Sequence, residues 1–419
     1  LGVDPRCGWT IDSFGHHPQF PQLMRKCGFD HAVFQRLMEK GSPSEFIWQG
    51  IDGSQLLCHW MPRGYGLFYG APANLPEFTP CAQERIELLA AHAVTPHLLA
   101  LAGADLTPVE PQLVEMIHAF NRSQSQVELR LATPAEFFAA LKASGAQLPT
   151  VTGDLNPVFQ GSYSARIEVT QWNRKLETRL VDAEKWDAVA RRFDAPPQDS
   201  ALRQAWRPVL FNQFHDIICS SHIDAVFHNS LNRFRYAQSR ADEALQASLE
   251  AIAAQIDTRG DGIPLIVFNP LGWERSDVVE CSVAFSESGV FELSVIDAAG
   301  RPTPCDLLLA ERYADGSLKR ARLLFIARQL PALGYEVYRI LPDQAPPVAS
   351  DLTVSHPYGP ALRQDLDHGW MENSFYRLEF DLWSGVITHL FDKAHGWQAI
   401  SESLPFANTV VKERDYGNV

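Results

Sequence analysis

The spacing of apolar and polar residues changes twice along the chain, near residue 160 and near residue 262. Before the first change, short apolar runs alternate with helical stretches, which is typical of an α/β domain. Between the two changes, apolar residues recur every three or four positions, which predicts helices. After the second change, apolar and polar residues alternate, which predicts antiparallel strands. We therefore expect three domains, at residues 1–150, 151–258 and 262–419.

Two segments of the first domain carry clear local signals. HLLALAG at 97–103 is a short apolar run that predicts a buried strand, and Asp105 lies just beyond its end. Ligands of α/β sheets bind at the carboxyl ends of strands, so Asp105 is a candidate site residue. The segment at 126–141 predicts a strand followed by a helix, which Thr133 and Glu136 begin with a capping box.

The second domain carries a long apolar stripe, and the third has the period of strands. The stripe consists of Trp172, Leu176, Leu180, Ala183, Phe234, Ala237, Ala241, Leu245, Leu249, Ile252 and Ile256. A helical bundle buries such a stripe, and TRGDG at 258–262 ends the helical region. In the third domain, FELSVID at 291–297 and YRLEFD at 376–381 alternate, which predicts a β-sandwich. No closing strand precedes Val419, so we expect the sandwich to be incomplete.

Composition and charge exclude several classes of protein. The chain has 50 acidic and 36 basic residues and a net charge of −14, which disfavours binding to nucleic acid. No run reaches the ~18 apolar residues that a membrane span needs, so we expect no membrane partner. The seven cysteines form no CxxC pair, which argues against a zinc ribbon or a disulfide scaffold and fits a cytoplasmic protein. A homo-oligomer is compatible with these properties.

Several polar residues stand in apolar or loop surroundings, where catalytic and binding residues occur. They are Asp12 in WTIDSFGHH, Asp105, Tyr163 and Arg166 in GSYSARIEV, and His215 and Asp216 in NQFHDI. Each also has an ordinary structural interpretation: an Asx turn, a strand-end cap, a solvated helix start or a hydrogen-bonded core histidine. The chain has no phosphate loop, no GxSxG elbow and no HExxH motif. The carboxylates and the imidazole suit a divalent metal or a pair of acids that perform hydrolysis.

Many segments resemble, in the same order, those of the glycoside hydrolase family 38 α-mannosidases. GWTIDSFGHH at 8–17 is similar to the sequence around the family's nucleophile, and NQFHDI at 212–217 is similar to its His-Asp metal motif. The other similar segments are FIWQGIDGS at 46–54, LALAGADLTP at 99–108, GSYSARIEVTQWNRKLE at 161–177, VFNPLGWERSDVVE at 267–280, LPALGYEVYRI at 330–340, ENSFYRLEFD at 372–381 and GVITHLFDK at 385–393. A series of motifs in order is far more specific than a single one.

The resemblance implies a zinc-dependent retaining exo-α-mannosidase that acts on terminal α-mannosides. Asp12 would be the nucleophile, which forms a covalent mannosyl-enzyme, and also a ligand of the single zinc ion. His215 would be a second zinc ligand, and Asp105 would be the general acid/base. The residues that would contact the sugar are Trp9, Tyr163, Arg166 and Asp216. A retaining glycosidase needs two such carboxyls, one ionised and one protonated.

The resemblance also implies a fold class and shows one departure. The expected class is multidomain α/β + α + β, with a seven-stranded, barrel-like α/β catalytic domain, a three-helix bundle that completes the active site, and an antiparallel β-sandwich. The family, here in its bacterial type, draws two further zinc ligands from a His-x-Asp pair near its N-terminus, and this chain has no such pair before Asp12. We therefore expect an N-terminally truncated, inactive fragment whose remaining ligands lie upstream of Leu1. His17 replaces a common Ser, and Ala104 replaces the first of two paired acids.

Three alternatives stay open. The chain could be a non-catalytic, carbohydrate-binding relative that has kept the fold without turnover. It could be a mannosyl-glycerate hydrolase, whose substrate is also an α-mannoside. It could be a metal-dependent deacetylase or amidohydrolase on an α/β barrel, which would form no covalent sugar intermediate.

Overall fold

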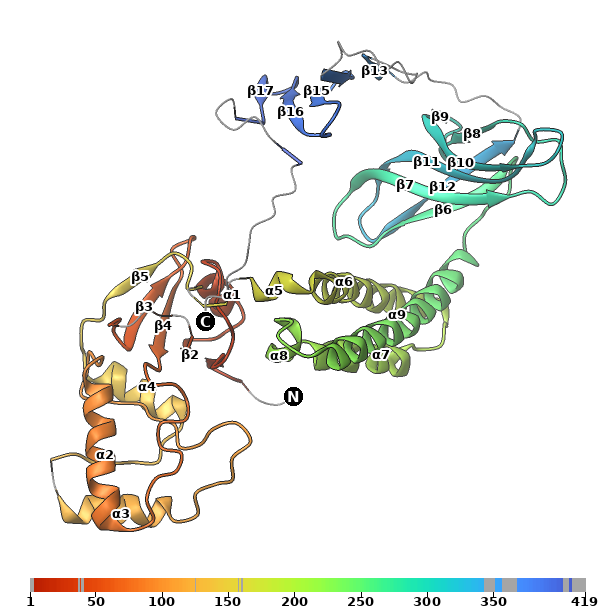
Figure 1. Ribbon diagram of the computed structural model, residues 1–419. Coiled ribbons are helices and arrows are strands. Elements are labelled where there is room, and N and C mark those ends of the chain that lie inside the picture. Colours follow the sequence, from red (N-terminus) through yellow and green to blue (C-terminus); the bar gives the residue numbers. More distant parts are fainter. Residues whose placement is uncertain are drawn as a thin grey trace. The chain divides into compact units, whose positions relative to one another are not determined.

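The chain forms two compact units. Figure 1 shows the computed structural model with its helices and strands labelled. It describes residues 4–36, 38, 41–124, 126–156, 158–159, 161–342, 351–355, 368–401 and 407–408. The first unit contains the residues up to Val181 together with Asp199–Asp242. The second contains Asp182–Gln198 together with Glu243–Tyr416. The division into three domains stays a prediction.

A five-stranded sheet forms the centre of the first unit. Its strands, in spatial order, are β1 (Cys7–Trp9), β2 (His31–Phe34), β4 (Gln55–Trp60), β3 (Glu45–Gln49) and β5 (Thr150–Thr152). β1, β2 and β4 run parallel, whereas β3 is antiparallel to β4. The carboxyl ends of β1, β2 and β4 therefore share one edge, where ligands bind in such sheets. The resemblance implies seven strands in a barrel-like arrangement, but the described residues form an open sheet of five.

Four helices accompany this sheet. They are α1 (Phe20–Lys26), α2 (Leu75–Ala90), α3 (Leu113–Ser123) and α4 (Pro134–Ala143). The predicted capping box of α4 is confirmed, because Thr133 and Glu136 exchange side-chain and backbone hydrogen bonds. Phe34, Phe46 and Trp48 are completely buried in the sheet. Each such side chain contributes about 1.5–3 kcal/mol of hydrophobic stabilisation, so this core holds the strand ends in place.

Two predicted strands of the first unit do not form. Residues 97–103 make no sheet pairing, although two of their leucines pack against the cluster around Phe137. A loop can thus partly cover an apolar run, and the run alone does not distinguish a loop from a strand. The segment before α4 is also a loop. The Asn121 side chain bonds both the N–H and the carbonyl of Leu129 and takes the place of a neighbouring strand.

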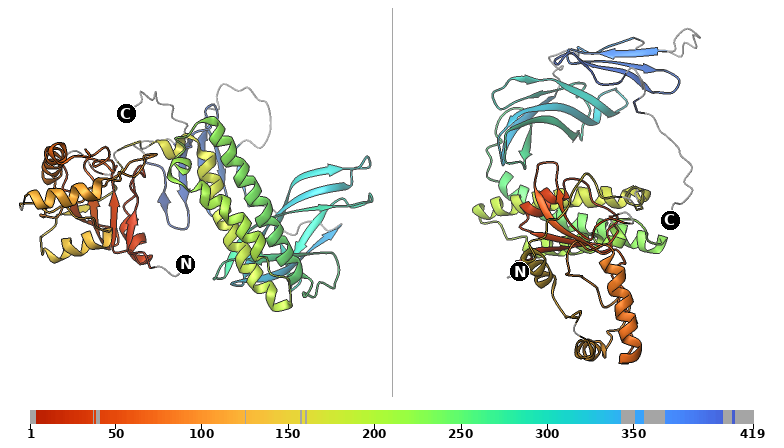
Figure 2. Two further views of the ribbon diagram at one scale, coloured as in Figure 1. Left: turned by 90° about the horizontal axis from the view of Figure 1, so that it is seen from below. Right: turned by 90° about the vertical axis from the view of Figure 1, so that its left-hand side faces the viewer.

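The middle region is helical, as predicted. Its helices are α5 (Ser162–Ala165), α6 (Ile167–Ala190), the short 3₁₀ helix η1 (Arg191–Phe193), α7 (Asp199–Asn212), α8 (His215–Ile218) and α9 (Asp224–Ala253). α6 and α9 lie side by side in both ribbon figures (Figure 2). The rings of Trp172 and Phe234 stack at 6.4 Å, and Arg179 pairs with Asp242 at 2.6 Å. These contacts bury the predicted apolar stripe between the helices.

The second unit is mainly antiparallel β-structure, as predicted. One sheet consists of β6 (Ile263–Asn269), β12 (Gly334–Pro342), β8 (Leu293–Ile296) and β9 (Pro302–Thr303), and another of β10 (Cys305–Arg312), β11 (Leu318–Leu330) and β7 (Arg275–Ala284). Tyr338 from the first sheet and Phe325 from the second share one buried cluster, so the two sheets form a sandwich. A further sheet consists of β13 (Thr353–Val354), β14 (His368–Glu372), β15 (Tyr376–Asp381), β16 (Ile387–Asp392) and β17 (Trp397–Gln398).

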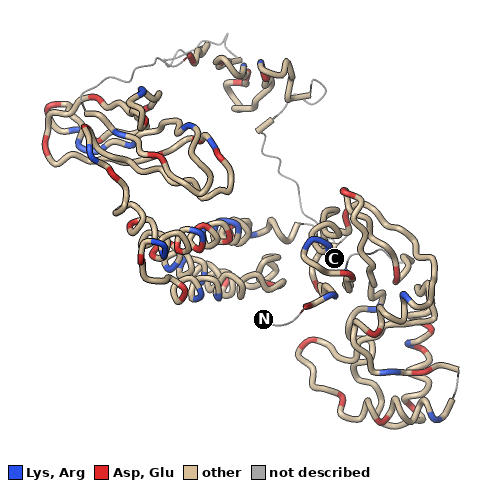
Figure 3. Tube along the Cα trace, turned by 180° about the vertical axis from the view of Figure 1, so that it is seen from behind, with Lys and Arg blue, Asp and Glu red and all other residues tan. Residues whose placement is uncertain are grey.

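Basic and acidic residues are interspersed along the described chain, as the colours of the trace show (Figure 3). On α6, for example, Arg174 pairs with Glu177 at 3.1 Å. Within the described ranges, none of the helices has both the length and the apolar character that crossing a bilayer requires.

Candidate active site

The shared carboxyl edge of β1 and β2 carries Asp12 and Arg36. Beyond β1, the N–H of Thr10 bonds the carbonyl of Val33 at 3.0 Å, and the chain then turns at Asp12. Phe14 is buried and anchors this turn. Arg36 follows the end of β2, and its Nε donates a hydrogen bond to Asp12 Oδ1. The other carboxylate oxygen of Asp12, Oδ2, faces away from this contact and toward His215.

Arg36 is held by more than its bond to Asp12. Its guanidinium lies 5.2 Å from the centre of the Phe14 ring and 5.9 Å from that of Phe159. Such cation–π contacts orient the group as well as attract it. The hydrogen bond to Asp12 raises the pKa of Arg36 above its usual value. Asp12 therefore faces a permanent positive charge.

A bend between α7 and α8 presents His215. α7 ends at Asn212, which is completely buried and donates a hydrogen bond of 2.9 Å to the carbonyl of Ser230 on α9. Gln213 then donates a bond of 2.8 Å to Glu177 on α6. The polar residues that interrupt the apolar NQFHDI segment therefore anchor the bend to both neighbouring helices, and His215 follows it directly.

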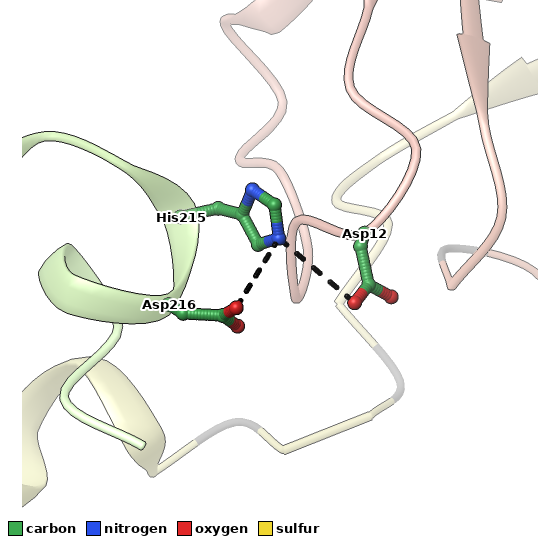
Figure 4. Close-up of side chains that lie close together, drawn as sticks. All are labelled: Asp12, His215 and Asp216. Atoms are coloured by element: carbon green, nitrogen blue, oxygen red, sulfur yellow. Dashed lines mark ion pairs between the residues drawn. The ribbon is translucent and has the colours of Figure 1, made fainter. Parts of the chain in front are cut away.

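Asp12, His215 and Asp216 converge, although they come from distant parts of the sequence (Figure 4). His215 Nε2 lies 4.0 Å from Asp12 Oδ2 and 3.7 Å from Asp216 Oδ2. Each residue offers a ligand atom, and the three atoms lie within 4.8 Å of one another. The Asp12 side chain is 15% exposed and that of His215 is 36% exposed, so the cluster can be reached from solvent.

Asp105 lies on a separate loop and contacts Tyr65. The Tyr65 hydroxyl donates a hydrogen bond of 2.7 Å to Asp105 Oδ2. This bond raises the pKa of Tyr65 to about 12, with burial and the charge of Asp12 acting in the same direction. Tyr65 therefore lies near both carboxylates to which the resemblance assigns catalysis.

The other predicted site residues have different surroundings. Trp9 is exposed at the end of β1. Burial raises the pKa of Tyr163 above 10, and a hydrogen bond with the Phe14 backbone acts in the opposite direction, so Tyr163 lies at the Asp12 turn. Arg166 pairs with Asp224 at 2.7 Å, within the helical region. The structure thus brings Tyr163 to the turn that carries Asp12 and engages Arg166 in an ion pair.

His16, the first of the two histidines that follow Asp12, stabilises the turn itself. His16 Nε2 lies 3.0 Å from the Thr10 hydroxyl, and its ring stacks on that of Phe20 at 4.0 Å. Burial, with a smaller effect of the charge on His17, lowers the pKa of His16 to about 4. His16 is therefore neutral near pH 7 and acts as a packing residue.

Arg36 and Tyr65 are the site residues that sequence reasoning missed. Their positions in the sequence could have identified both residues, because Arg36 follows the end of β2 and Tyr65 follows the end of β4, two parallel strands. The same rule selected Asp105. A search of every strand end for charged and hydroxyl side chains would have found them.

His215 fits a zinc ion shared with Asp12, or with Asp216, in donor type and in spacing. Zinc in proteins takes imidazole nitrogens and carboxylate oxygens at about 2.0–2.2 Å, so two of its ligand atoms lie at most about 4.4 Å apart. The distances of 4.0 and 3.7 Å from His215 Nε2 satisfy this limit. Arg36 donates its hydrogen bond to Asp12 Oδ1, so Asp12 Oδ2 is the oxygen that faces the His215 imidazole. Catalytic zinc sites also keep one position for water or substrate.

Two family models match consecutive parts of the chain. Residues 1–161 match the glycosyl hydrolases family 38 N-terminal domain, and residues 157–252 match the alpha mannosidase middle domain. The first match contains Asp12 and Asp105, and the second contains His215 and Asp216. The cluster is therefore assembled from both matched domains.

Similar proteins point to the same family. Alpha-mannosidase 2C1 from Mus musculus is 27% identical over 71% of this chain and 29% of its own length. Alpha-mannosidase 2 from Rattus norvegicus is 25% identical over 91% of this chain and 43% of its own length. The crystal structure of an alpha-mannosidase from Enterococcus faecalis V583 matches with a TM-score of 0.74 at 20% identity, over 95% of this chain and 48% of that chain, which shows the fold alone. The chain thus spans less than half the length of these relatives. It belongs to glycoside hydrolase family 38, the family of α-mannosidases.

Proposed function

We propose that the protein is a zinc-dependent retaining exo-α-mannosidase that hydrolyses terminal α-mannosides. The observation that carries the proposal is the approach of His215 Nε2 to within 4.0 Å of Asp12 Oδ2. These two residues lie in two successive matched domains of the family. Neither structural alternative, an Asx turn or a core histidine, requires the two side chains to meet.

Asp12 and Asp105 would divide the chemistry between them. Asp12 attacks the anomeric carbon while Asp105 protonates the departing glycosidic oxygen, which keeps the electron pair of the broken bond. Asp105 then removes a proton from water, and the water oxygen displaces Asp12 from the sugar. Arg36 orients the Asp12 carboxylate through Oδ1. Two displacements at the same carbon retain the anomeric configuration.

Asp12 and His215 would hold the zinc ion, and Asp216 lies within reach of the same position. When bound, zinc supplies a positive charge that stabilises oxygen atoms of the sugar as the reaction proceeds. Tyr163 and Trp9 would contact the sugar, since one lies at the Asp12 turn and the other is exposed at the end of β1. The role of Arg166 stays a prediction, and so does a cytoplasmic location, which the seven free cysteines support.

Hydrolysis of 4-nitrophenyl α-mannoside tests this proposal. We expect the longest natural form that contains this chain to release nitrophenol, to lose activity with a chelator and to regain it with added zinc. Asp12→Ala removes the nucleophile, so it should lower kcat by at least about 1000-fold. Asp257→Ala is the matched control, because Asp257 is an exposed carboxylate that pairs locally with Arg259.

Each other outcome favours a different function. Zinc-dependent turnover that survives Asp12→Ala would refute the nucleophile assignment. Mannoside binding without turnover would favour a carbohydrate-binding relative. Turnover confined to mannosyl-glycerate would favour that hydrolase, and release of acetate or ammonia from amide substrates would favour the deacetylase or amidohydrolase.

A further inference from the structure

The loop that carries Asp105 and the loop after β4 contact each other directly. The N–H of Phe68 bonds the carbonyl of Leu101 at 3.0 Å. Gly66 lies so close to Ala104 that a Cβ on Gly66 would be 3.5 Å from the Ala104 side chain. These contacts set the position of one loop relative to the other, and they flank the bond between Tyr65 and Asp105.

Asp105 stands in a tight turn. The Thr107 hydroxyl donates a bond of 2.7 Å to the Ala104 carbonyl and accepts one of 3.1 Å from the Ala104 N–H. Leu106 has a φ of 55° and its side chain is fully exposed. A left-handed conformation costs a non-glycine residue about 1 kcal/mol or more, and such costs concentrate at functional sites. The turn therefore positions the Asp105 backbone, and the bond from Tyr65 restrains the Asp105 carboxylate.

We propose that Tyr65 is a positioning residue for Asp105: its hydroxyl holds Oδ2, so that Oδ1 is the oxygen that faces the glycosidic bond. This inference rests on the proposed acid/base role of Asp105. A general acid must present its proton within hydrogen-bond reach of the leaving oxygen, and a rotating carboxylate does so only part of the time. The other charged groups near Tyr65 are Asp12 and Arg36, from the ends of β1 and β2.

The proton then follows one route. While Oδ2 accepts the bond from Tyr65, the acidic proton of Asp105 resides on Oδ1 and passes from there to the leaving oxygen. In the second step, Oδ1 takes a proton from water and the cycle closes. Tyr65 keeps its own proton throughout, because its pKa is about 12.

The dependence of rate on the leaving group tests this role, with Tyr65→Phe as the variant. The dinitrophenolate group of a 2,4-dinitrophenyl mannoside departs without being protonated. The methoxy group of a methyl mannoside must be protonated by an acid before it departs. If Tyr65 positions the acid, kcat/KM should fall by about 100-fold for the methyl mannoside and by no more than about 3-fold for the dinitrophenyl mannoside. Tyr69→Phe is the matched control, because Tyr69 lies on the same loop and is exposed. It should match the wild type with both substrates.

The outcomes separate this inference from the proposed function. Equal losses with both substrates would mean that Tyr65 only binds or stabilises, and would overturn the inference. Asp105→Ala should show the same selective loss, and an unselective result there would overturn the acid role of Asp105 itself. Crystal structures of the wild type and Tyr65→Phe supply a readout that needs no turnover. The variant should show a rotated or disordered Asp105 carboxylate, and an unchanged carboxylate would contradict the inference.

Discussion

At the scale of the residue, the two oxygens of Asp12 have different neighbours. Oδ1 accepts from Arg36, and Oδ2 faces His215. A carboxylate that binds a metal through one oxygen can still attack a carbon with the other, and the two oxygens of Asp12 are already distinct. The sequence marks Asp12 as a candidate. Its contact with Arg36, however, depends on the parallel register of β1 and β2, which residue spacing alone does not define.

His16 belongs to the same scale and gives a prediction about pH. Burial lowers its pKa from 6.5 to about 4. Between these values the unfolded chain binds a proton that the folded chain does not, so stability falls as the pH drops. We expect His16 to contribute about 2 kcal/mol to this fall and His16→Asn to remove that contribution. Urea unfolding at about pH 7 and about pH 4.5 measures it. His118→Asn, at an exposed site, is the control and should keep the pH dependence of the wild type. If His16→Asn also kept it, the prediction would be contradicted.

At the scale of the element, α4 shows how far local sequence determines structure. Its capping box needs only Thr133 and Glu136, and both the prediction and the structure contain it. Thr133→Ala removes the cap and should lower the free energy of unfolding by about 1 kcal/mol. Thr178→Ala, at an exposed position inside α6, should change it by no more than about 0.5 kcal/mol. Denaturant unfolding of both variants measures the difference, and equal effects would contradict the role of the cap.

The elements that were predicted wrongly lacked such local determinants. The apolar run at 97–103 has the composition of a strand, but no neighbouring strand pairs with it. The alternating residues before α4 meet the Asn121 side chain instead of a sheet. Both outcomes depend on contacts with distant residues. The helices of the middle region and strand β15, by contrast, carry their period within one segment, and they were predicted from it.

At the scale of the whole molecule, the candidate site exists only when two regions of the chain fold together. Asp12 comes from the α/β part and His215 from the helical part. Residue types and spacing suggested a metal or an acid pair, but no local rule predicts that these two side chains meet. The ordered series of family motifs supplied that expectation. The series of family motifs did not point to Arg36 and Tyr65, because their roles follow from the packing of strand ends and loops.

The measurement that tests the central claim most directly is covalent trapping with a 5-fluoro-mannosyl fluoride, followed by mass spectrometry of proteolytic peptides. The fluorine slows release of the sugar from the nucleophile, so the mannosyl-enzyme accumulates. The account predicts one added fluoro-mannosyl group on the peptide that contains Asp12, and none in Asp12→Ala. A label on another carboxylate, or active enzyme that never becomes labelled, would contradict it.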